Sequence, residues 1–102
     1  MNYIYLIKNS EDSRYKIGVS ENPERRIKEL NTGGSSEFLL INKFESEYAY
    51  KIEGTLHRTY SYLRKHGEWF DFSIKEDNDF IKNCINIENR IKTLIEAGNE
   101  FI

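Results

Sequence analysis

Four side chains between residues 5 and 53 are of the types that hydrolyse a phosphodiester bond. They come from four separate segments: Tyr5, Lys16, Arg26 and Glu53. A carboxylate can hold a divalent ion, which polarises a phosphate and steadies the leaving oxygen. An arginine offsets the negative charge that develops on the phosphate, and a phenol or an amine takes a proton from water. The set therefore indicates metal-assisted hydrolysis, provided that the fold brings the four side chains to one surface.

The arginine lies on a predicted helix that begins at Pro23 and ends near Leu30. Pro23, Ile27 and Leu30 define an apolar stripe, and the spacing places Arg26 within it. An arginine on the inner edge of a short helix is costly unless it meets an anion. A snorkelling arginine or a structural ion pair would explain the position equally well.

Glu53 repeats this pattern on a longer predicted helix that Ser46 could cap and that runs to about Leu63. The helix has an apolar stripe of Ala49, Ile52, Leu56, Tyr60 and Leu63, and Glu53 sits inside it. His57 follows one turn later, so the two could be paired metal ligands, although a partly buried Glu–His or Glu–Arg contact needs no metal. Gly54 costs about 1 kcal/mol relative to Ala in a helix, which close approach of another group would explain.

The tyrosine and the lysine belong to a predicted antiparallel hairpin of strands Asn2–Lys8 and Arg14–Val19. Alternation places them on one face, with Tyr5 opposite about position 16. If the aliphatic faces pack inward, Tyr5 and Lys16 meet on the open face of the sheet. The alternative is a tyrosine and a lysine on a solvated face without further role.

The remaining segments complete an α+β pattern. Phe38–Phe44 is predicted as a strand, residues 68–72 as a short extended piece, and Asp79–Ala97 as an amphipathic helix. The expected fold is a small three-stranded antiparallel sheet flanked by helices, in the order β-β-α-β-α-(β)-α. The 102 residues fit a single domain, 1–102, with its motifs in residues 3–72 and a C-terminal helix over 79–97.

Composition excludes several classes of protein. The single cysteine, Cys84, cannot form an intrachain disulfide, and no segment has membrane length, so an intracellular setting without membrane contact is expected. The net charge of −2 does not favour bulk nucleic-acid binding. However, residues 1–66 hold 11 Lys and Arg against 9 Asp and Glu, while residues 67–102 hold 4 against 8. A phosphate-facing surface should therefore lie in the first two thirds of the chain.

At these residues the sequence resembles the GIY-YIG endonuclease superfamily, especially the small phage-, virus- and bacteria-borne domains related to phage T5 open reading frame 172. Tyr3-Ile4-Tyr5 stands where that family has Gly-Ile-Tyr, and Lys16-Ile17-Gly18 where it has Tyr-Ile-Gly. Arg26 falls on the family arginine and Glu53 on its metal-binding glutamate. A later run, Gly67-Glu68-Trp69-Phe70, is similar to the end of the branch signature.

Three departures from the family pattern matter. Tyr3 replaces the first glycine, and Val19 stands where the family often has a lysine that contacts phosphate. Lys16 replaces the tyrosine of Tyr-Ile-Gly, and alternation places Tyr15 on the opposite face, so it should not substitute. Tyr5 is therefore the expected water-activating residue.

The resemblance implies one divalent ion, Mg²⁺ or Mn²⁺, on Glu53 and a phosphate oxygen. Arg26 would stabilise the pentavalent phosphate, and Lys16 would position phosphate or act as the base. His57 would contact a phosphate, or it would contact a metal ligand without touching the metal itself. Trp69 and Phe70 are expected in the core, and Glu68 as a cap or solvated carboxylate rather than a second ligand.

The implied partner is nucleic acid, DNA rather than RNA, with specificity from loops, a homodimer or a partner protein. The main alternative is a nucleic-acid-binding module of the same fold that has lost turnover, which the net charge and Lys16 favour. A third hypothesis is a protein-interaction domain that uses the acidic C-terminal part.

Overall fold

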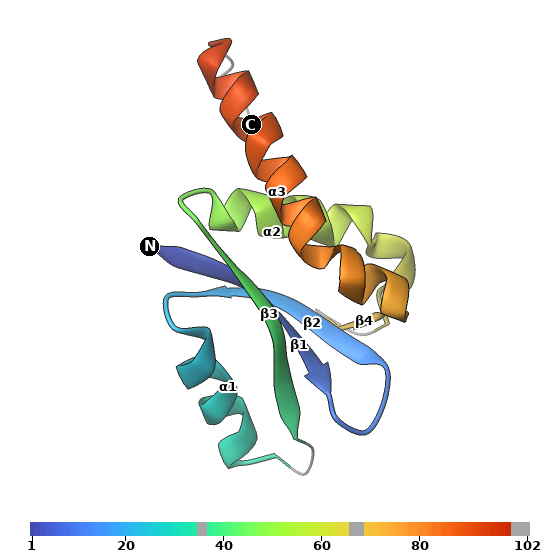
Figure 1. The fold of residues 1–102 in the computed structure, drawn as a ribbon. Helices are drawn as coiled ribbons and strands as arrows, with labels where there is room; N and C mark the ends of the chain where they lie inside the picture. The colour runs from blue at the N-terminus through green and yellow to red at the C-terminus, as the bar shows by residue number, and fades with distance from the viewer. Residues whose placement is uncertain (35–36, 66–68, 99–102) are drawn as a thin grey trace.

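The computed structural model describes residues 1–34, 37–65 and 69–98. Its centre is an antiparallel sheet of four strands in the order β3-β1-β2-β4 (Figure 1). The strands are β1 (Asn2–Asn9), β2 (Arg14–Ser20), β3 (Phe38–Ser46) and β4 (Trp69–Asp71). The prediction of three strands is wrong, because the short extended piece joins the sheet.

The fourth strand is short because it pairs only with the beginning of β2. Trp69, Phe70 and Asp71 lie opposite Lys16, Tyr15 and Arg14. Phe70 is fully buried, as expected, and Trp69 is partly buried. Residues 67 and 68 of the late motif, including Glu68, lie outside the described residues.

The β1–β2 hairpin has a register different from the predicted one. Tyr5 lies opposite Gly18, and Lys16 lies opposite Ile7. The pairs place the centre of the turn between residues 11 and 12, beyond the position assumed from the polar run. The alternation itself is correct, so Tyr5, Lys16 and Gly18 still share one face.

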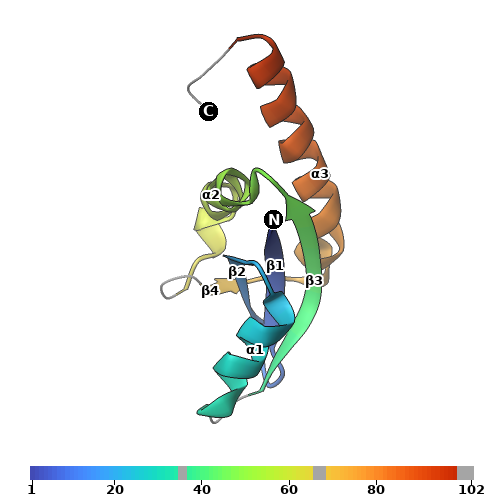
Figure 2. The ribbon, with the colours of Figure 1, turned by 90° about the vertical axis from the view of Figure 1, so that its left-hand side faces the viewer.

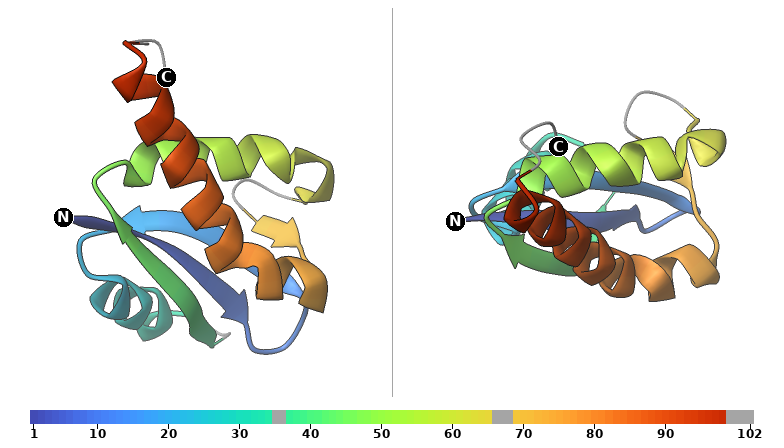
Figure 3. Two further views of the ribbon diagram at one scale, coloured as in Figure 1. Left: turned by 45° about the horizontal axis from the view of Figure 1, so that its top comes forward. Right: turned by 90° about the horizontal axis from the view of Figure 1, so that it is seen from above.

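Helices cover both faces of this sheet (Figures 2 and 3). Helix α1 (Pro23–Thr32) packs through Ile27 on the face of Tyr5 and Ile7. Helices α2 (Ala49–Thr59) and α3 (Ile74–Glu96) pack on the other face, which carries Ile4 and Leu6. The prediction that Tyr5 lies on an open face of the sheet is therefore wrong. Ile7 makes that face apolar as well, and α1 covers it.

The start of α1 agrees with the sequence. The Asn22 side chain accepts a hydrogen bond from the Arg25 backbone N–H, and Pro23 occupies the first turn. The helix continues two residues beyond the predicted end at Leu30. This start fixes the direction in which α1 leaves β2.

Helix α2 is shorter than predicted at both ends. Ser46 does not cap it, because Ser46 is the last residue of β3 and pairs with Asn2. The N-cap is Tyr48, whose backbone N–H donates to Ser46 Oγ. After Thr59 the chain forms a separate 3₁₀ turn, η1 (Ser61–Leu63).

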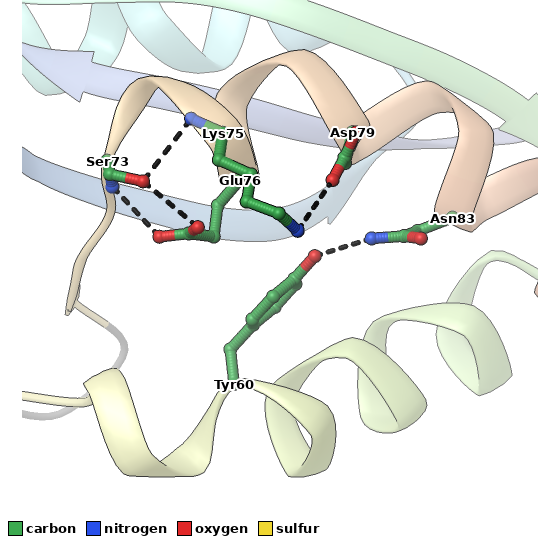
Figure 4. A network of polar contacts seen from close by, with 6 residues as sticks. All are labelled: Tyr60, Ser73, Lys75, Glu76, Asp79 and Asn83. Carbon is green, nitrogen blue, oxygen red and sulfur yellow. Dashed lines mark hydrogen bonds and ion pairs between the residues drawn. The ribbon is translucent and has the colours of Figure 1, made fainter.

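Helix α3 begins at Ile74 rather than at Asp79. Ser73 and Glu76 form a capping box that starts it five residues earlier (Figure 4). In the same view Asn83 donates a hydrogen bond to the Tyr60 hydroxyl, which ties α3 to the end of α2. None of the helices within the described ranges is both long and apolar enough to cross a membrane.

Tyr15 joins β2 to the start of α3. Its ring is buried beside Phe72, and its hydroxyl donates to Asp77 Oδ2 at 2.8 Å. Burial, with Asp77 as the second cause, raises the pKa of Tyr15 to about 12. An unfolded tyrosine has a pKa of about 10. The unfolded chain therefore loses this proton first, and stability should fall as pH rises from 10 to 12.

We predict that Tyr15 contributes about 1–2 kcal/mol to this alkaline loss of unfolding free energy. Urea denaturation of the wild type and of Tyr15→Phe at pH 9 and pH 11.5 measures it. The difference in stability between the two proteins should shrink at the higher pH. A difference that is the same at both pH values would contradict this account.

Candidate functional site

The second half of β2 is an open edge of the sheet. Strand β4 pairs with Arg14–Lys16 only, and no strand in the described part of the chain pairs with residues 17–20 on that side. After Ser20 the chain enters α1, which lies on the face of the sheet that carries Tyr5. Helix α2 lies on the opposite face. The two helices that carry Arg26 and Glu53 thus adjoin the same stretch of strand from opposite faces.

Tyr5 lies across this stretch because Gly18 has no side chain. A Cβ at Gly18 would be 2.4 Å from the Tyr5 hydroxyl oxygen and 2.5 Å from the ring carbon that carries it. Carbon atoms in contact are normally about 3.5–4.0 Å apart. The phenol of β1 therefore occupies the place of the missing side chain on β2.

The hydroxyl of Tyr5 is the part of the residue that reaches the surface. Tyr5 is only 3% exposed, with its ring packed in the smaller core cluster beside Ile7 and Ile27. The hydroxyl has no hydrogen-bond partner among the described residues, and no described side-chain oxygen or nitrogen is both buried and unsatisfied. A rigidly held phenol thus presents its oxygen to solvent above β2.

Lys16 lies on the same face as Tyr5 and Gly18, two residues before the glycine. It is partly buried and pairs across the sheet with Trp69 and Ile7. It has an interaction partner, so it is not free. The structure thus groups Tyr5 and Lys16 on the α1 side of β2, in the order that alternation predicts.

Arg26 is more exposed than the sequence indicates. Its side chain is 45% exposed and lies 3.6 Å from Glu29. Pro23 and Ile27 alone are buried in α1, so the arginine lies beside the stripe and not within it. The prediction of an inner-edge arginine is wrong, because the stripe of α1 is too narrow to include Arg26.

A shallow hollow of about 260 Å³ lies where β2 passes into α1. Arg25 and Arg26 line it together with Ser20, Asn22 and two carboxylates, Glu21 and Glu29. The two arginines supply the positive charge that an incoming phosphate needs. Both arginines pair with Glu29 in this structure, since Glu29 lies 3.3 Å from Arg25 and 3.6 Å from Arg26.

Glu53 and His57 lie on α2, across the sheet from Tyr5. Glu53, which is predicted inside the apolar stripe, is partly buried, whereas Ile52 and Leu56 of the stripe are fully buried, and Glu53 has an interaction partner. His57 Nε2 lies 3.0 Å from the carbonyl oxygen of Ile17. A carbonyl only accepts, so Nε2 carries the proton, and Nδ1 then accepts from Arg64 at 3.4 Å.

The bond from His57 to Ile17 is the feature that sequence reasoning missed. It ties α2 to the open edge of β2, next to Gly18, and the His57 ring also meets Phe70 edge-on. Both ring nitrogens are engaged, so in this arrangement His57 positions the strand and does not face a phosphate. No spacing rule links residues 17 and 57, because the contact depends on the tertiary fold.

Tyr15 is placed as its alternation predicts. It points to the face of α2 and α3, where its hydroxyl binds Asp77, and it cannot replace the missing tyrosine at position 16.

On α2, a divalent ion would find the carboxylate of Glu53. Within the described residues no three His, Cys, Asp or Glu side chains cluster as a metal cage. Mg²⁺ commonly uses one or two carboxylates and fills its other positions with water and substrate phosphate. Glu53 therefore suits an ion that arrives with the substrate and does not suit a structural metal.

The Tyr5–Gly18 packing predicts a specific stability defect. Gly18→Ala should lower the free energy of unfolding by about 1–3 kcal/mol through overpacking, measured by urea denaturation. The control is Gly33→Ala, since a Cβ there would meet nothing within 4 Å. That change should leave stability unaltered or slightly raised. Equal costs for the two substitutions would contradict the packing argument.

The His57–Ile17 bond predicts a second defect. His57→Ala should cost about 1–3 kcal/mol, because it leaves the Ile17 carbonyl without its donor. His57→Gln, which can offer an amide N–H at a similar position, should recover part of the loss. Thermal denaturation of the three proteins measures this, and equal stability of the alanine and glutamine variants would show that the bond contributes nothing.

Comparison with protein families accounts for most of the chain. The model of the T5orf172 domain matches residues 2–88, which include every residue of the site. No curated protein and no solved structure matches. The resemblance noted in the sequence is thereby confirmed, and the chain belongs to the T5orf172 domain family, which is associated with nuclease-type folds.

Proposed function

We propose that the protein is a metal-dependent endonuclease that hydrolyses phosphodiester bonds, in DNA rather than RNA, at the open edge of β2. One observation carries the proposal: a buried tyrosine ring, locked over Gly18, presents a hydroxyl without a described protein partner to solvent. A hydroxyl that reaches solvent can bond to a water molecule, which is the group that a general base must reach.

In this proposal Tyr5 takes the proton from the attacking water. Its ring cannot swing away, because β1, β2 and Ile27 hold it. A fixed group within reach of the water is the geometric requirement for general base catalysis. Lys16, on the same face, positions the phosphate by its positive charge.

Arg26 stabilises the negative charge of the pentavalent phosphate. Its 45% exposure leaves the guanidinium accessible from the hollow at the start of α1. The contact with Glu29 is at the surface, where ion pairs contribute little, so a phosphate can displace the carboxylate. Hydrogen bonds from arginine to phosphate are charge-assisted and frequently bidentate.

Glu53 holds the divalent ion, Mg²⁺ or Mn²⁺. When bound, such an ion supplies polarisation of the phosphate and charge stabilisation for the leaving oxygen. His57 fixes the strand that passes between Glu53 and Tyr5, through its bond to the Ile17 carbonyl.

A second candidate function is nucleic-acid binding without turnover. Two observations favour it: Lys16 replaces the family tyrosine, and Arg26 is paired with Glu29. Such a module would bind DNA in a salt-dependent way and release no products.

A plasmid nicking assay separates the two functions. The wild type should nick supercoiled plasmid with Mg²⁺ or Mn²⁺, and EDTA should abolish the activity. Arg26→Ala should lower the rate by about 10²–10³-fold. Glu53→Gln should reduce it to background, and Tyr5→Phe, which keeps the ring over Gly18, should lower it by about 10²–10⁴-fold.

Matched controls come from neighbouring exposed residues. Lys28→Ala on α1 and Glu47→Gln ahead of α2 should keep wild-type rates. Nicking that is equal in the wild type and in Glu53→Gln would reveal contamination and reject the proposal. Binding of DNA by an intact wild type that never nicks it would instead establish the second function.

A further inference from the structure

A groove lies between α2 and α3, away from the hollow at the start of α1. On the α2 side it is lined by residues that do not belong to the buried stripe of that helix. Two hollows of about 360 and 270 Å³ adjoin there and share Thr55, Arg58 and Ile91. Their other lining residues are Tyr50, Lys51, Gly54, Ile87, Arg90 and Leu94. Neither hollow includes any residue of the candidate site, so this groove is a separate feature.

The groove carries positive charge that no ion pair among the described residues neutralises. Lys51, Arg58 and Arg90 are exposed, and no carboxylate lines either hollow. None of the three makes an ion pair within the described residues. In a chain of net charge −2, three unpaired cations in one groove select an anionic partner.

Arg58 lines both hollows, and Thr55 holds its guanidinium there. Its Nη2 donates to Thr55 Oγ1 at 3.2 Å. Its Nη1 lies 3.4 Å from the position that a Cβ of Gly54 would take. The bare backbone at Gly54 thus lies beside the guanidinium, where a long side chain would take up space in the groove.

The walls of the groove are apolar and aromatic. Ile87 and Leu94 of α3 form one side, and Tyr50, which is 67% exposed, stands at the α2 side. A charged groove with an exposed aromatic ring is the arrangement that holds a single strand, with cations on the backbone and bases stacked on the ring.

We propose that the α2–α3 groove binds single-stranded nucleic acid. Lys51, Arg58 and Arg90 contact the backbone, and Tyr50 stacks on a base. The choice of nucleic acid over an acidic peptide rests on the proposed function. Arg90, Ile91 and Leu94 follow the last residue that the family model matches, so the groove is built partly by this chain's own extension of α3.

Fluorescence anisotropy with a labelled oligodeoxythymidylate, in EDTA so that nothing is cut, tests the proposal. Arg58→Ala/Arg90→Ala should weaken binding at least tenfold and reduce the salt slope by about 1.4, since each backbone contact to a single strand contributes about 0.7. Tyr50→Ala should weaken binding about tenfold. Gly54→Gln should do the same without loss of stability, because it takes up space in the groove and leaves every charge in place.

Lys82→Ala is the matched control, since Lys82 is an exposed cation of α3 that lines neither hollow. It should change affinity less than twofold. Unchanged binding in the groove variants would overturn the proposal, as would a groove that binds polyglutamate and not the oligonucleotide. The nicking of duplex plasmid is measured separately, so a wild type that binds the strand through this groove but never nicks would refute the nuclease and not the groove.

Discussion

The contact between the Tyr5 ring and the bare backbone of Gly18 is the constraint on which the site depends. The two residues lie opposite each other on adjacent strands, and the ring fills the space that a side chain at position 18 would need. A shift of the hairpin register would place a side chain under the phenol. The two triplets of the sequence are therefore one structural unit, in which the glycine of the second receives the tyrosine of the first.

Burial of both faces of the sheet then places the remaining groups. Because Tyr5 and Ile7 make the second face apolar, α1 must cover it, and Arg26 comes with α1 to the end of β2. The other face takes α2, which brings Glu53 and fixes β2 through the bond of His57 to Ile17. The short β4 leaves the strand edge between the two helices without a strand neighbour among the described residues. In the proposed function, this edge is the place where the phosphate is cut.

Local signals predicted the elements well, and tertiary contacts explain where they did not. The pair Asn22-Pro23 marks the start of α1 correctly, and alternation assigns Tyr5, Lys16 and Tyr15 to the right faces. The Ser73–Glu76 capping box is a local signal that marks the start of α3, whereas apolar periodicity alone predicts a start five residues later. The end of β3 at Ser46 could not be predicted from local sequence, because it depends on the pairing of Ser46 with Asn2 on another strand.

The site itself was only partly predictable. Residue types and the family pattern predict Tyr5, Arg26 and Glu53 as site residues, and their roles stay a prediction. Helical spacing places Arg26 inside a stripe that in fact excludes it. The hairpin register, and with it the packing of Tyr5 on Gly18, depends on the geometry of a turn. The link between His57 and Ile17 joins residues 40 positions apart, which no periodicity encodes.

Paramagnetic broadening by Mn²⁺ tests the central claim most directly, because it locates the ion without requiring turnover. In ¹⁵N-labelled protein with a non-cleavable oligonucleotide, Mn²⁺ should broaden amide signals of α2 around Glu53 and of β2 around Gly18, and Glu53→Gln should abolish the effect. Broadening centred on the acidic first turns of α3, unchanged by Glu53→Gln, would contradict a metal site at the open edge of β2.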